Sequence, residues 1–334
     1  MNNKILISDA TLRDGNHAIS HQITEQQIAV YCEAADSAGV PIIEVGHGNG
    51  LGGSSLQVGE AALTDEVMLT TARKYLNKAK LSVHAIPGFS TIERDLKPAI
   101  DCGVDIFRIA THCTEADITE RHIRFCQMEG KTVFGVLMMT HMAEKEVLSD
   151  EARKMQDYGA EGIILMDSSG NYLPNDVKEK VSFLKQNLHI AVGFHAHNNL
   201  GMGIANSLAA IEVGASMVDG CSRGFGAGAG NAQLEVLVPV LERLGYNTGI
   251  DLYKILDASD IVEEELIERL PTIGTASIVS GLTGVFSGYL TPVKRIAKEF
   301  DIDPRDLFFE LGRQKIVAGQ EDFIIEIAKE LSNS

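Results

Sequence analysis

Short apolar runs alternate with amphipathic segments along most of the chain. Eight runs rich in aliphatic residues recur, at residues 4–9, 41–46, 80–86, 104–110, 132–139, 162–167, 189–197 and 217–221. The segments between them, such as 24–38 and 174–186, carry apolar residues at helical spacing, and several are followed by a glycine of the kind that caps a helix. Because the runs are almost wholly apolar and do not alternate, we expect parallel strands buried on both faces.

Eight β/α units over roughly the first 245 residues predict a closed (β/α)8 TIM barrel. An open doubly wound sheet is the rival arrangement, and it commonly uses fewer strands. After residue 249 the pattern changes to helical segments at 251–269, 292–300, 305–317 and 322–331, with a glycine-punctuated stretch between the first two. We therefore predict a catalytic barrel over residues 1–260 and a helical C-terminal domain over residues 261–334, which could be a dimer interface, a lid or a docking surface for another protein.

Composition and charge narrow the class of protein. The 334 residues are 45% hydrophobic and 22% charged, which is typical of a globular chain. The formal charge of −17 would repel phosphate backbones and anionic lipid, so we expect neither nucleic acid nor a membrane as partner. The five cysteines form no CxxC pair, and the N-terminus has no room for a signal peptide. We therefore predict a cytoplasmic protein with reduced thiols.

Polar residues cluster after the first and seventh predicted strands. Arg13, Asp14 and His17 follow the first strand, and His195 and His197 end the seventh. Residues two apart on a strand point the same way, so the two imidazoles are spaced for one metal ion. Asp14, from what we expect to be the neighbouring strand, is the best oxygen ligand. Two histidines and one carboxylate suit Mn²⁺, Fe²⁺, Co²⁺ or Mg²⁺ better than a closed zinc site.

Other polar residues at predicted strand ends are open to two interpretations. Glu44 could be an outer partner of a metal-bound water or a structural carboxylate. Arg108 and His112 could add polarity to the site or form structural ion pairs. The loop around Ser169 offers hydroxyl and N–H donors for a carboxylate. The glycine-rich loop at 223–231 allows a ligand to approach the backbone, although this signal is weak by itself.

Longer motifs resemble a known family. The TLRDG sequence at 11–15, the paired histidines and the glycine-rich loop resemble the metal-dependent barrel lyases and synthases that include isopropylmalate synthase and hydroxymethylglutaryl-CoA lyase. A closer similarity, nearly end to end, is to the class II pyruvate aldolases that cleave 4-hydroxy-2-oxovalerate in aromatic hydrocarbon catabolism. It is carried by HGNGLGGSS at 47–55, ATHCTEAD at 110–117, GAGAGNA at 226–232 and GQED at 319–322.

This resemblance implies retro-aldol cleavage of a 4-hydroxy-2-oxo acid to pyruvate and an aldehyde. It implies that Asp14, His195 and His197 hold a divalent ion, usually Mn²⁺ in this family, with Co²⁺ or Mg²⁺ as alternatives. That ion would be a Lewis acid that stabilises a pyruvate enolate. It also implies a partner, an acylating aldehyde dehydrogenase that docks on the helical domain, and it leaves a homo-oligomer open.

The resemblance also assigns roles to individual residues. Arg13 would place positive charge where the enolate oxygen develops. His17 would take the proton from the 4-hydroxyl as the C3–C4 bond breaks, and the ordinary pKa of histidine suits a base at neutral pH. Ser169 would help to seat the substrate carboxylate, and His195 would also contact the substrate.

The chain departs from the family pattern at several positions. Phe286 stands where the family has a tyrosine, and Tyr289 could replace that phenol only if the backbone differs. Asn49 replaces an aspartate, His84 replaces an apolar residue where the aldehyde end of the substrate is expected, and Arg223 replaces a small residue. We therefore hypothesise that His84, together with Arg223, lines a pocket that binds a substrate with a polar aldehyde portion.

Three other functions compete with the aldolase. The first is a Claisen-type synthase or lyase that uses an acyl-CoA, although nothing in the sequence indicates a CoA site. The second is a partner-binding subunit whose active site has lapsed, which only the change to Phe286 supports. The third is a non-haem iron oxygenase with the same two-histidine, one-carboxylate ligands, which the other motifs do not suggest. The aldehyde chain and the stereochemistry at C4 are left open by the sequence.

Overall fold

Eight parallel strands close into a barrel in the computed structural model, which describes residues 3–332. Each strand is hydrogen-bonded to the next, and β8 pairs with β1 to close the ring. The strands are β1 (Leu6–Leu12), β2 (Ile42–Val45), β3 (Lys80–Ala85), β4 (Ile106–His112), β5 (Thr132–Met138), β6 (Gly162–Asp167), β7 (Ala191–Ala196) and β8 (Met217–Gly220). The predicted TIM barrel is confirmed.

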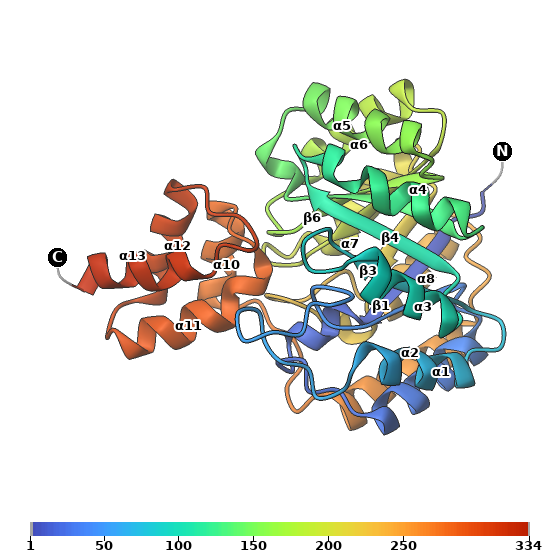
Figure 1. The fold of residues 1–334 in the computed structure, drawn as a ribbon, viewed down its shortest axis with the longest axis horizontal. Helices are drawn as coiled ribbons and strands as arrows, with labels where there is room; N and C mark the ends of the chain where they lie inside the picture. Colours follow the sequence, from blue (N-terminus) through green and yellow to red (C-terminus); the bar gives the residue numbers. More distant parts are fainter. Residues whose placement is uncertain (1–2, 333–334) are drawn as a thin grey trace.

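Helices follow the strands and cover the outside of the barrel (Figure 1). The first of them begins at a capping box, in which the Thr24 and Gln27 side chains each accept a hydrogen bond from the other's backbone N–H, and it ends at Gly39 with a φ of 85°. The helices are α1 (Glu25–Ala38), α2 (Asp65–Tyr75), α3 (Lys97–Asp101), α4 (Glu120–Met128), α5 (Lys145–Tyr158), α6 (Pro174–Asn187), α7 (Gly203–Glu212), α8 (Leu234–Arg243) and α9 (Leu252–Ile261).

The strands are buried on both faces because their side chains alternate between two apolar cores. On β4, Phe107 and Ile109 belong to the larger core between the strands and the helices. Ile106 and Ala110 belong to the smaller core inside the barrel. Arg108 lies between these two residues on the inner face, and only 1% of its surface is exposed. A charged group is therefore enclosed in the barrel's interior.

The first strand extends further than its apolar run predicts. Asp9 and Thr11 are polar, yet both are buried, because Asp9 Oδ1 accepts hydrogen bonds from the Thr11 backbone N–H at 2.9 Å and from the Thr11 hydroxyl at 2.5 Å. The strand therefore continues to Leu12, and Arg13 is the first residue beyond it.

Two other strands also differ from their predicted bounds. The fourth ends at His112, two residues later than predicted, which places Arg108 in the middle of the strand. The seventh ends at Ala196, and His197 follows it in an isolated bridge to Asn231. The polar side chains at these strand ends are held by local contacts that the apolar pattern cannot indicate.

The predicted helix at 251–269 is shorter in the structure. It ends at Ile261, one wide turn follows at Val262–Leu266, and extended backbone begins at Ile267. Four further helices then pack around a separate apolar core, as the helical extension predicts. They are α10 (Thr275–Thr283), α11 (Leu290–Glu299), α12 (Pro304–Arg313) and α13 (Asp322–Ser332), and they lie together on one side of the barrel (Figure 1).

Hydrogen bonds attach this helical region to the loops at the carboxyl ends of β5 and β6. Asn171 Nδ2 donates to the Gly281 carbonyl at 2.7 Å, and His141 Nε2 lies 2.9 Å from the Gly284 carbonyl oxygen. The Ser287 backbone N–H donates to the carbonyl of Ser168 at 2.9 Å. The helical region therefore lies over the end of the barrel at which catalytic groups gather in this fold.

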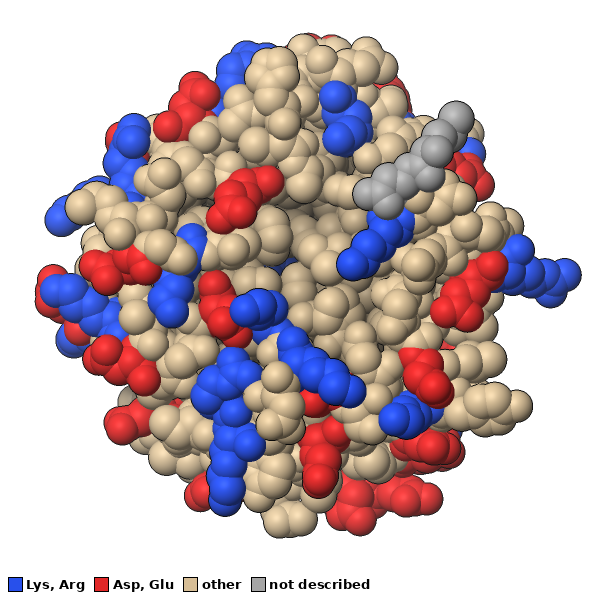
Figure 2. Space-filling view, turned by 90° about the vertical axis from the view of Figure 1, so that its right-hand side faces the viewer, with Lys and Arg blue, Asp and Glu red and all other residues tan. Residues whose placement is uncertain are grey.

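The opposite face of the molecule carries both signs of charge. Lys and Arg side chains are interspersed with Asp and Glu around a central hollow (Figure 2). Between residues 3 and 332, no helix has the length and apolar character needed to cross a membrane. All five cysteines are free thiols.

A single carboxylate joins α1 to the chain that enters β3, and its removal tests this packing. Asp36 is 5% exposed, and its Oδ1 accepts the backbone N–H groups of Asn77, Lys78 and Ala79 at 3.1, 2.7 and 2.7 Å. Asp36→Ala should lower the free energy of unfolding by about 3 kcal/mol, roughly 1 kcal/mol for each N–H left unpaired. Urea denaturation measures this loss. Asp257→Ala, on the exposed side of α9, is the control and should change little.

Candidate metal centre

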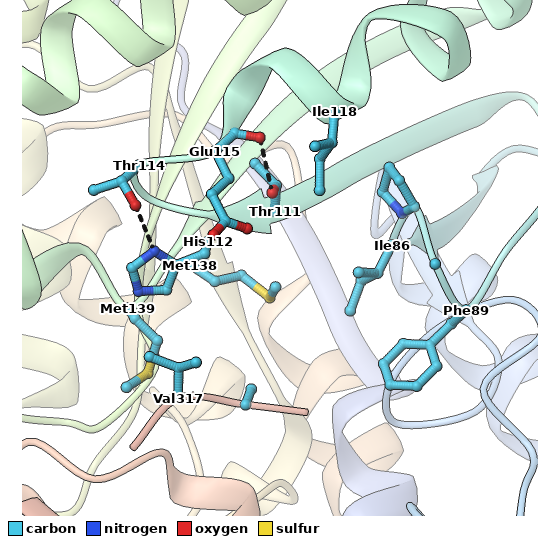
Figure 3. Close-up of a pocket in the computed structure, with 13 residues that line it drawn as sticks. Ile86, Phe89, Thr111, His112, Thr114, Glu115, Ile118, Met138, Met139 and Val317 are labelled. Atoms are coloured by element: carbon cyan, nitrogen blue, oxygen red, sulfur yellow. Dashed lines mark hydrogen bonds between the residues drawn. The ribbon is translucent and has the colours of Figure 1, made fainter. Parts of the chain in front are cut away.

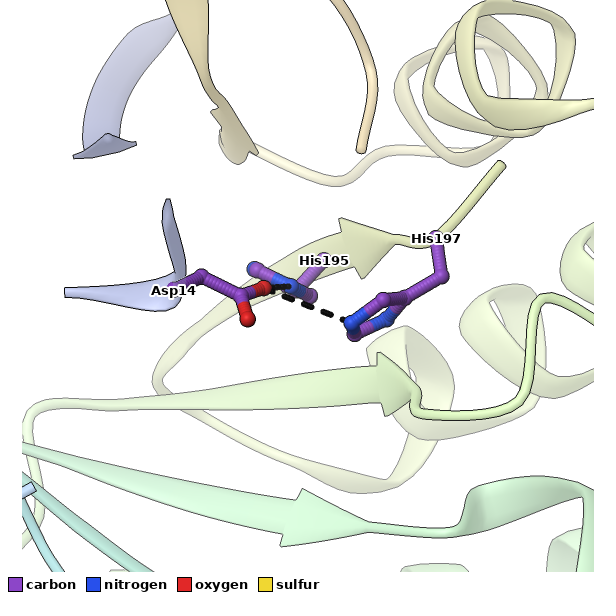
Figure 4. A group of neighbouring side chains, drawn as sticks. All are labelled: Asp14, His195 and His197. Carbon is purple, nitrogen blue, oxygen red and sulfur yellow. Dashed lines mark ion pairs between the residues drawn. The ribbon is translucent and has the colours of Figure 1, made fainter. Parts of the chain in front are cut away.

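Three candidate ligands from β1 and β7 meet in the interior. Asp14 follows β1 by two residues and opens a short 3-10 turn, Asp14–His17. Its Oδ2 lies 3.2 Å from His195 Nε2 and 3.3 Å from His197 Nε2 (Figure 4). The ligand atoms of the three residues all lie within 4.8 Å of one another, and the three side chains are almost fully buried. The structure thus brings together the three residues that the sequence spacing selected.

The hydrogen bonds of the two histidines leave one ring nitrogen of each free for a metal ion. His195 Nδ1 lies 2.8 Å from Asp219 Oδ2, and His197 Nδ1 lies 2.9 Å from the Asp167 carbonyl oxygen. These oxygens can only accept, so each Nδ1 carries the proton when the ring is neutral. Each Nε2 is then a buried lone pair without a hydrogen-bond donor, directed at a carboxylate. A divalent cation among these atoms fits this donor set.

Asp14 is held as a carboxylate by its surroundings. Burial by itself would raise its pKa, but the positive charge of Arg13 opposes burial, and the pKa is held well below its usual value. Asn231 Nδ2 also donates to Asp14 Oδ2 at 2.7 Å. Asn231 is the last residue of the glycine-rich loop at 223–231, so this loop places a polar group beside the candidate ligands. The carboxylate is therefore charged at neutral pH.

The strands that supply the ligands are not neighbours, and this expectation from the sequence is wrong. β8 lies between β7 and β1 and pairs with both. Asp14 and His195 meet because both lie at the barrel's interior, where side chains from non-adjacent strands converge. Asp219, on the inner face of the intervening strand β8, contacts the other ring nitrogen of His195.

Arg13 is fixed beside the candidate metal ligands. Its Nε lies 2.5 Å from Glu44 Oε1, and its Nη1 lies 3.6 Å from Asp14 Oδ1 and 3.3 Å from the Gly48 carbonyl oxygen. Its Nη2 is buried and has no hydrogen-bond partner. The guanidinium therefore has a donor left for a substrate oxygen.

Glu44 pairs with two arginine side chains and is not part of the candidate metal cluster. Burial would raise its pKa, but Arg108 and Arg13 outweigh burial and lower the pKa to about 2. Its Oε2 lies 3.0 Å from Arg108 Nη1. Of the two interpretations of Glu44, the structure therefore favours the structural carboxylate, one that orients Arg13.

His17 lies at the edge of the cluster, and burial lowers its pKa to about 4, so its imidazole is neutral at pH 7. The ring packs so closely on Gly48 that a Cβ there would lie 2.6 Å from His17 Nε2, and only glycine fits. The ring of Phe286 approaches His17 edge-on, with 6.2 Å between the ring centres. A neutral imidazole in this position can accept a proton.

Ser169 lies nearby, but its hydroxyl is engaged by another side chain. His141 Nε2 faces the Gly284 carbonyl, so His141 Nδ1 is an acceptor, and the Ser169 hydroxyl donates to it at 3.2 Å. The Ser169 carbonyl oxygen accepts from Asn199 Nδ2 at 2.9 Å. In this arrangement Ser169 joins the β6 loop to His141, which itself contacts the helical region, and the Ser169 hydroxyl proton is not directed at the metal cluster.

Neither Arg223 nor Tyr289, the residue considered as a replacement for the missing phenol, directs its polar group at the metal cluster. Arg223 forms ion pairs with Asp260 and Glu263, so the expectation that it lines the substrate pocket is wrong. Tyr289 donates its hydroxyl to the Val317 carbonyl at 2.6 Å and so cannot replace the phenol absent from Phe286. The reason in both cases is that the loops turn these side chains toward partners distant in sequence.

His84 does lie in the interior. It is 2% exposed, its Nδ1 has no hydrogen-bond partner, and Arg13 and Arg108 reinforce the effect of burial in holding its pKa well below the usual value. A neutral imidazole with an unpaired nitrogen is therefore present in the barrel near Arg13.

Two cavities lie between the barrel and the helical region. One, of about 580 Å³, is lined by His17 and Phe286 from the site and by residues of α11 and α13. The other, of about 390 Å³, lies at the ends of β3, β4 and β5, where Phe89, Met138 and Met139 face Val317 (Figure 3). Both cavities are lined by residues from the barrel and from the helical region.

The fold and the site define a (β/α)8 barrel protein with a candidate divalent-metal centre at the carboxyl ends of its strands. Residues 4–262 match the HMGL-like family, and residues 271–333 match the DmpG-like communication domain. Within this class, the chain belongs to the 4-hydroxy-2-oxovalerate aldolase family, and the resemblance seen in its motifs is confirmed.

Individual relatives show how far this similarity extends. The chain is 64% identical over 329 residues to a 4-hydroxy-2-oxovalerate aldolase from Spirochaeta aurantia, covering 98% of this chain and 96% of that one. It is 58% identical over 332 residues to one from Pectobacterium atrosepticum, covering 99% and 97%. The carboxyl transferase domain of Rhizobium etli pyruvate carboxylase shares the fold, with a TM-score of 0.83 at 16% identity, over 99% of this chain and 60% of that one.

Removal of one candidate ligand tests the metal centre. His197→Ala should weaken Mn²⁺ binding by about a hundredfold or more, because only two protein ligands would remain. The electron paramagnetic resonance signal of free Mn²⁺ measures this directly. His189→Ala, an exposed histidine before β7, is the matched control and should bind Mn²⁺ as the wild type does. Equal Mn²⁺ affinity in the two variants would rule out this centre.

Proposed function

We propose that this protein cleaves a 4-hydroxy-2-oxo acid, of the 4-hydroxy-2-oxovalerate type, to pyruvate and an aldehyde in a reaction that depends on a divalent metal. The observation that carries the proposal is the convergence of Asp14, His195 and His197 beside Arg13 and His17. The names of its relatives support the same reaction. The acyl-CoA alternative has no such support.

A bound divalent cation would supply a Lewis acid that draws electron density from the 2-oxo group. We infer that Asp14, His195 and His197 hold it, and that Mn²⁺ is the ion used, with Co²⁺ or Mg²⁺ as alternatives. Two imidazoles and a carboxylate without a thiolate favour these ions over a structural zinc.

The protein's own residues divide the remaining chemistry. His17 is neutral and accepts the proton of the 4-hydroxyl group. The electron pair of the C3–C4 bond then moves into the C2–C3 bond, C4 becomes the aldehyde carbon, and the C2 oxygen gains negative charge. The unpaired Nη2 of Arg13 is the donor that balances this charge. A proton delivered to C3 completes the pyruvate product.

The burial of these groups also keeps water away from the charges that act on the substrate. Arg13, Asp14, His195 and His197 are each at most 4% exposed, so the charges act in an interior of low dielectric constant. His17 lies at the margin, where the larger cavity begins. Because His17 accepts the 4-hydroxyl proton, C4 of the substrate lies beside this margin in the proposal, with Ser169 near the carboxylate end if its hydroxyl turns from His141.

We propose the domain division at 1–260 and 261–334, with the helical domain docking an acylating aldehyde dehydrogenase. The match of residues 271–333 to a communication domain supports this partner. The cavity that begins at His17 and Phe286 and continues between α11 and α13 lies on the side of the site facing that domain. A cytoplasmic location, a role in aromatic catabolism and a homo-oligomer stay predictions from the sequence.

The proposal is tested by pyruvate release from a panel of 4-hydroxy-2-oxo acids, with enzyme stripped of metal and then supplied with Mn²⁺. Release that depends on Mn²⁺ is the expected result. If the enzyme binds Mn²⁺ yet releases pyruvate from no panel member, the aldolase proposal fails. The acyl-CoA reaction would then be the next to assay.

His17→Ala tests the assignment of the base. Without an acceptor for the 4-hydroxyl proton, kcat for cleavage should fall by about 10²- to 10⁴-fold. Exchange of the pyruvate C3 protons with solvent, which does not need that acceptor, should fall much less. Cleavage and exchange are measured on the same Mn²⁺-loaded protein. If cleavage survives in His17→Ala, the base is another group.

A second candidate, an aldolase with a polar aldehyde portion, is favoured by the unpaired nitrogen of His84. His84→Leu should then lower kcat/KM for substrates with a hydroxylated aldehyde portion by about tenfold relative to 4-hydroxy-2-oxovalerate, since one hydrogen bond is lost. Arg223→Leu, whose side chain faces Asp260 and Glu263, is the control and should leave the substrate preference unchanged. An unchanged preference in His84→Leu would contradict this candidate.

A further inference from the structure

Six polar side chains form a closed ring inside the barrel, in which each member contacts the next. The distances between neighbours around the ring are 3.6, 2.5, 3.0, 2.5, 2.8 and 3.2 Å. Every member is at most 4% exposed, and acidic and basic side chains alternate. In order, the members are Asp14, Arg13, Glu44, Arg108, Asp219 and His195.

Arg108 closes this ring from the side opposite to the metal cluster. Its Nη1 lies 3.0 Å from Glu44 Oε2, and its Nη2 lies 2.5 Å from Asp219 Oδ2. Its Nη1 also lies 3.4 Å from the hydroxyl of Ser8. A guanidinium is planar, and its two Nη atoms are a fixed distance apart. One rigid group therefore determines the distance between two carboxylates that come from different strands.

Each of these two carboxylates orients a group of the reaction site. Asp219 accepts from His195 Nδ1 and so fixes the direction of His195 Nε2, the candidate metal ligand. Glu44 accepts from Arg13 Nε and so fixes the direction of the unpaired Arg13 Nη2. His195, as a metal ligand, and Arg13, as a hydrogen-bond donor to the substrate, must act on the same 2-oxo group. Their relative position is therefore decisive.

We propose that Arg108 is a positioning residue that sets the relative position of His195 and Arg13 through Asp219 and Glu44. It contacts neither Asp14 nor His197, so its effect on a bound metal passes through the ring. This inference rests on the metal centre proposed above. Arg108 lies in the middle of β4, across the barrel from β7 and β8, and so extends the reaction site to a further strand.

A purely structural role for Arg108 makes different predictions. In that case Arg108 serves only to neutralise two buried carboxylates, and its replacement lowers stability without changing the metal site. A positioning role requires that metal affinity and substrate use change even in a variant that is folded. The two roles are therefore separated by measuring metal binding and thermal unfolding on the same protein.

Arg108→Lys is the informative variant, because it keeps the positive charge but loses the two-armed geometry. We expect its Mn²⁺ affinity, measured on the metal alone by electron paramagnetic resonance, to fall by about tenfold or more, as is usual when an outer partner of a ligand is lost. Asp219→Asn should weaken Mn²⁺ binding similarly, and the double variant should lose less than the product of the two factors.

The matched control is Arg73→Lys, at the ion pair with Asp105 near the start of β4, which should bind Mn²⁺ as the wild type does. An Arg108→Lys protein that is folded and binds Mn²⁺ within twofold of the wild type overturns the proposal. If Arg108→Lys does not fold, Arg108→Gln, which keeps an amide donor at the same position but loses the charge and the second arm, decides in the same way. Failure of the wild-type protein itself to bind Mn²⁺ would instead overturn the metal centre.

Discussion

A carboxylate that is removed from water needs cationic or hydrogen-bond partners, and this requirement organises the interior of the barrel. Asp14, Glu44 and Asp219 are all within 1% of full burial. Arg13 and Arg108 contact all three between them. The same strands also supply apolar residues to the inner core, with Ile42 on β2, Ile106 on β4 and Met217 on β8. Polar and apolar residues therefore share the barrel interior, and the candidate site lies among the polar ones.

The loops at the carboxyl ends of the strands also hold the helical region in place. Asn199 follows the candidate ligand His197 by two residues, and its Nδ2 donates to the Ser287 hydroxyl at 2.9 Å and to the Ser169 carbonyl at 2.9 Å. Phe286, beside Ser287, contacts the ring of His17. The same short segment of the helical region is thus anchored next to a metal ligand and lies against the proposed base.

The sequence predicts the barrel, and the convergence of the two histidines, because both depend on local patterns. Apolar runs indicate buried parallel strands, and two histidines two residues apart on a strand point in the same direction. It could not show Asp219, although a carboxylate within the apolar run of β8 was a usable signal, because its partners Arg108 and His195 are distant in sequence. Arg223 was misplaced for the same reason, since only the folded chain brings it to Asp260.

We propose that these residues activate the pyruvate half of the substrate when a divalent metal is bound. The most direct measurement is the exchange of pyruvate C3 protons in ²H₂O, followed by nuclear magnetic resonance with no aldehyde present. We expect exchange that is catalysed by the Mn²⁺-loaded enzyme, abolished by chelation and restored when Mn²⁺ is added back. An enzyme that binds Mn²⁺ at this centre and exchanges no C3 protons would contradict it.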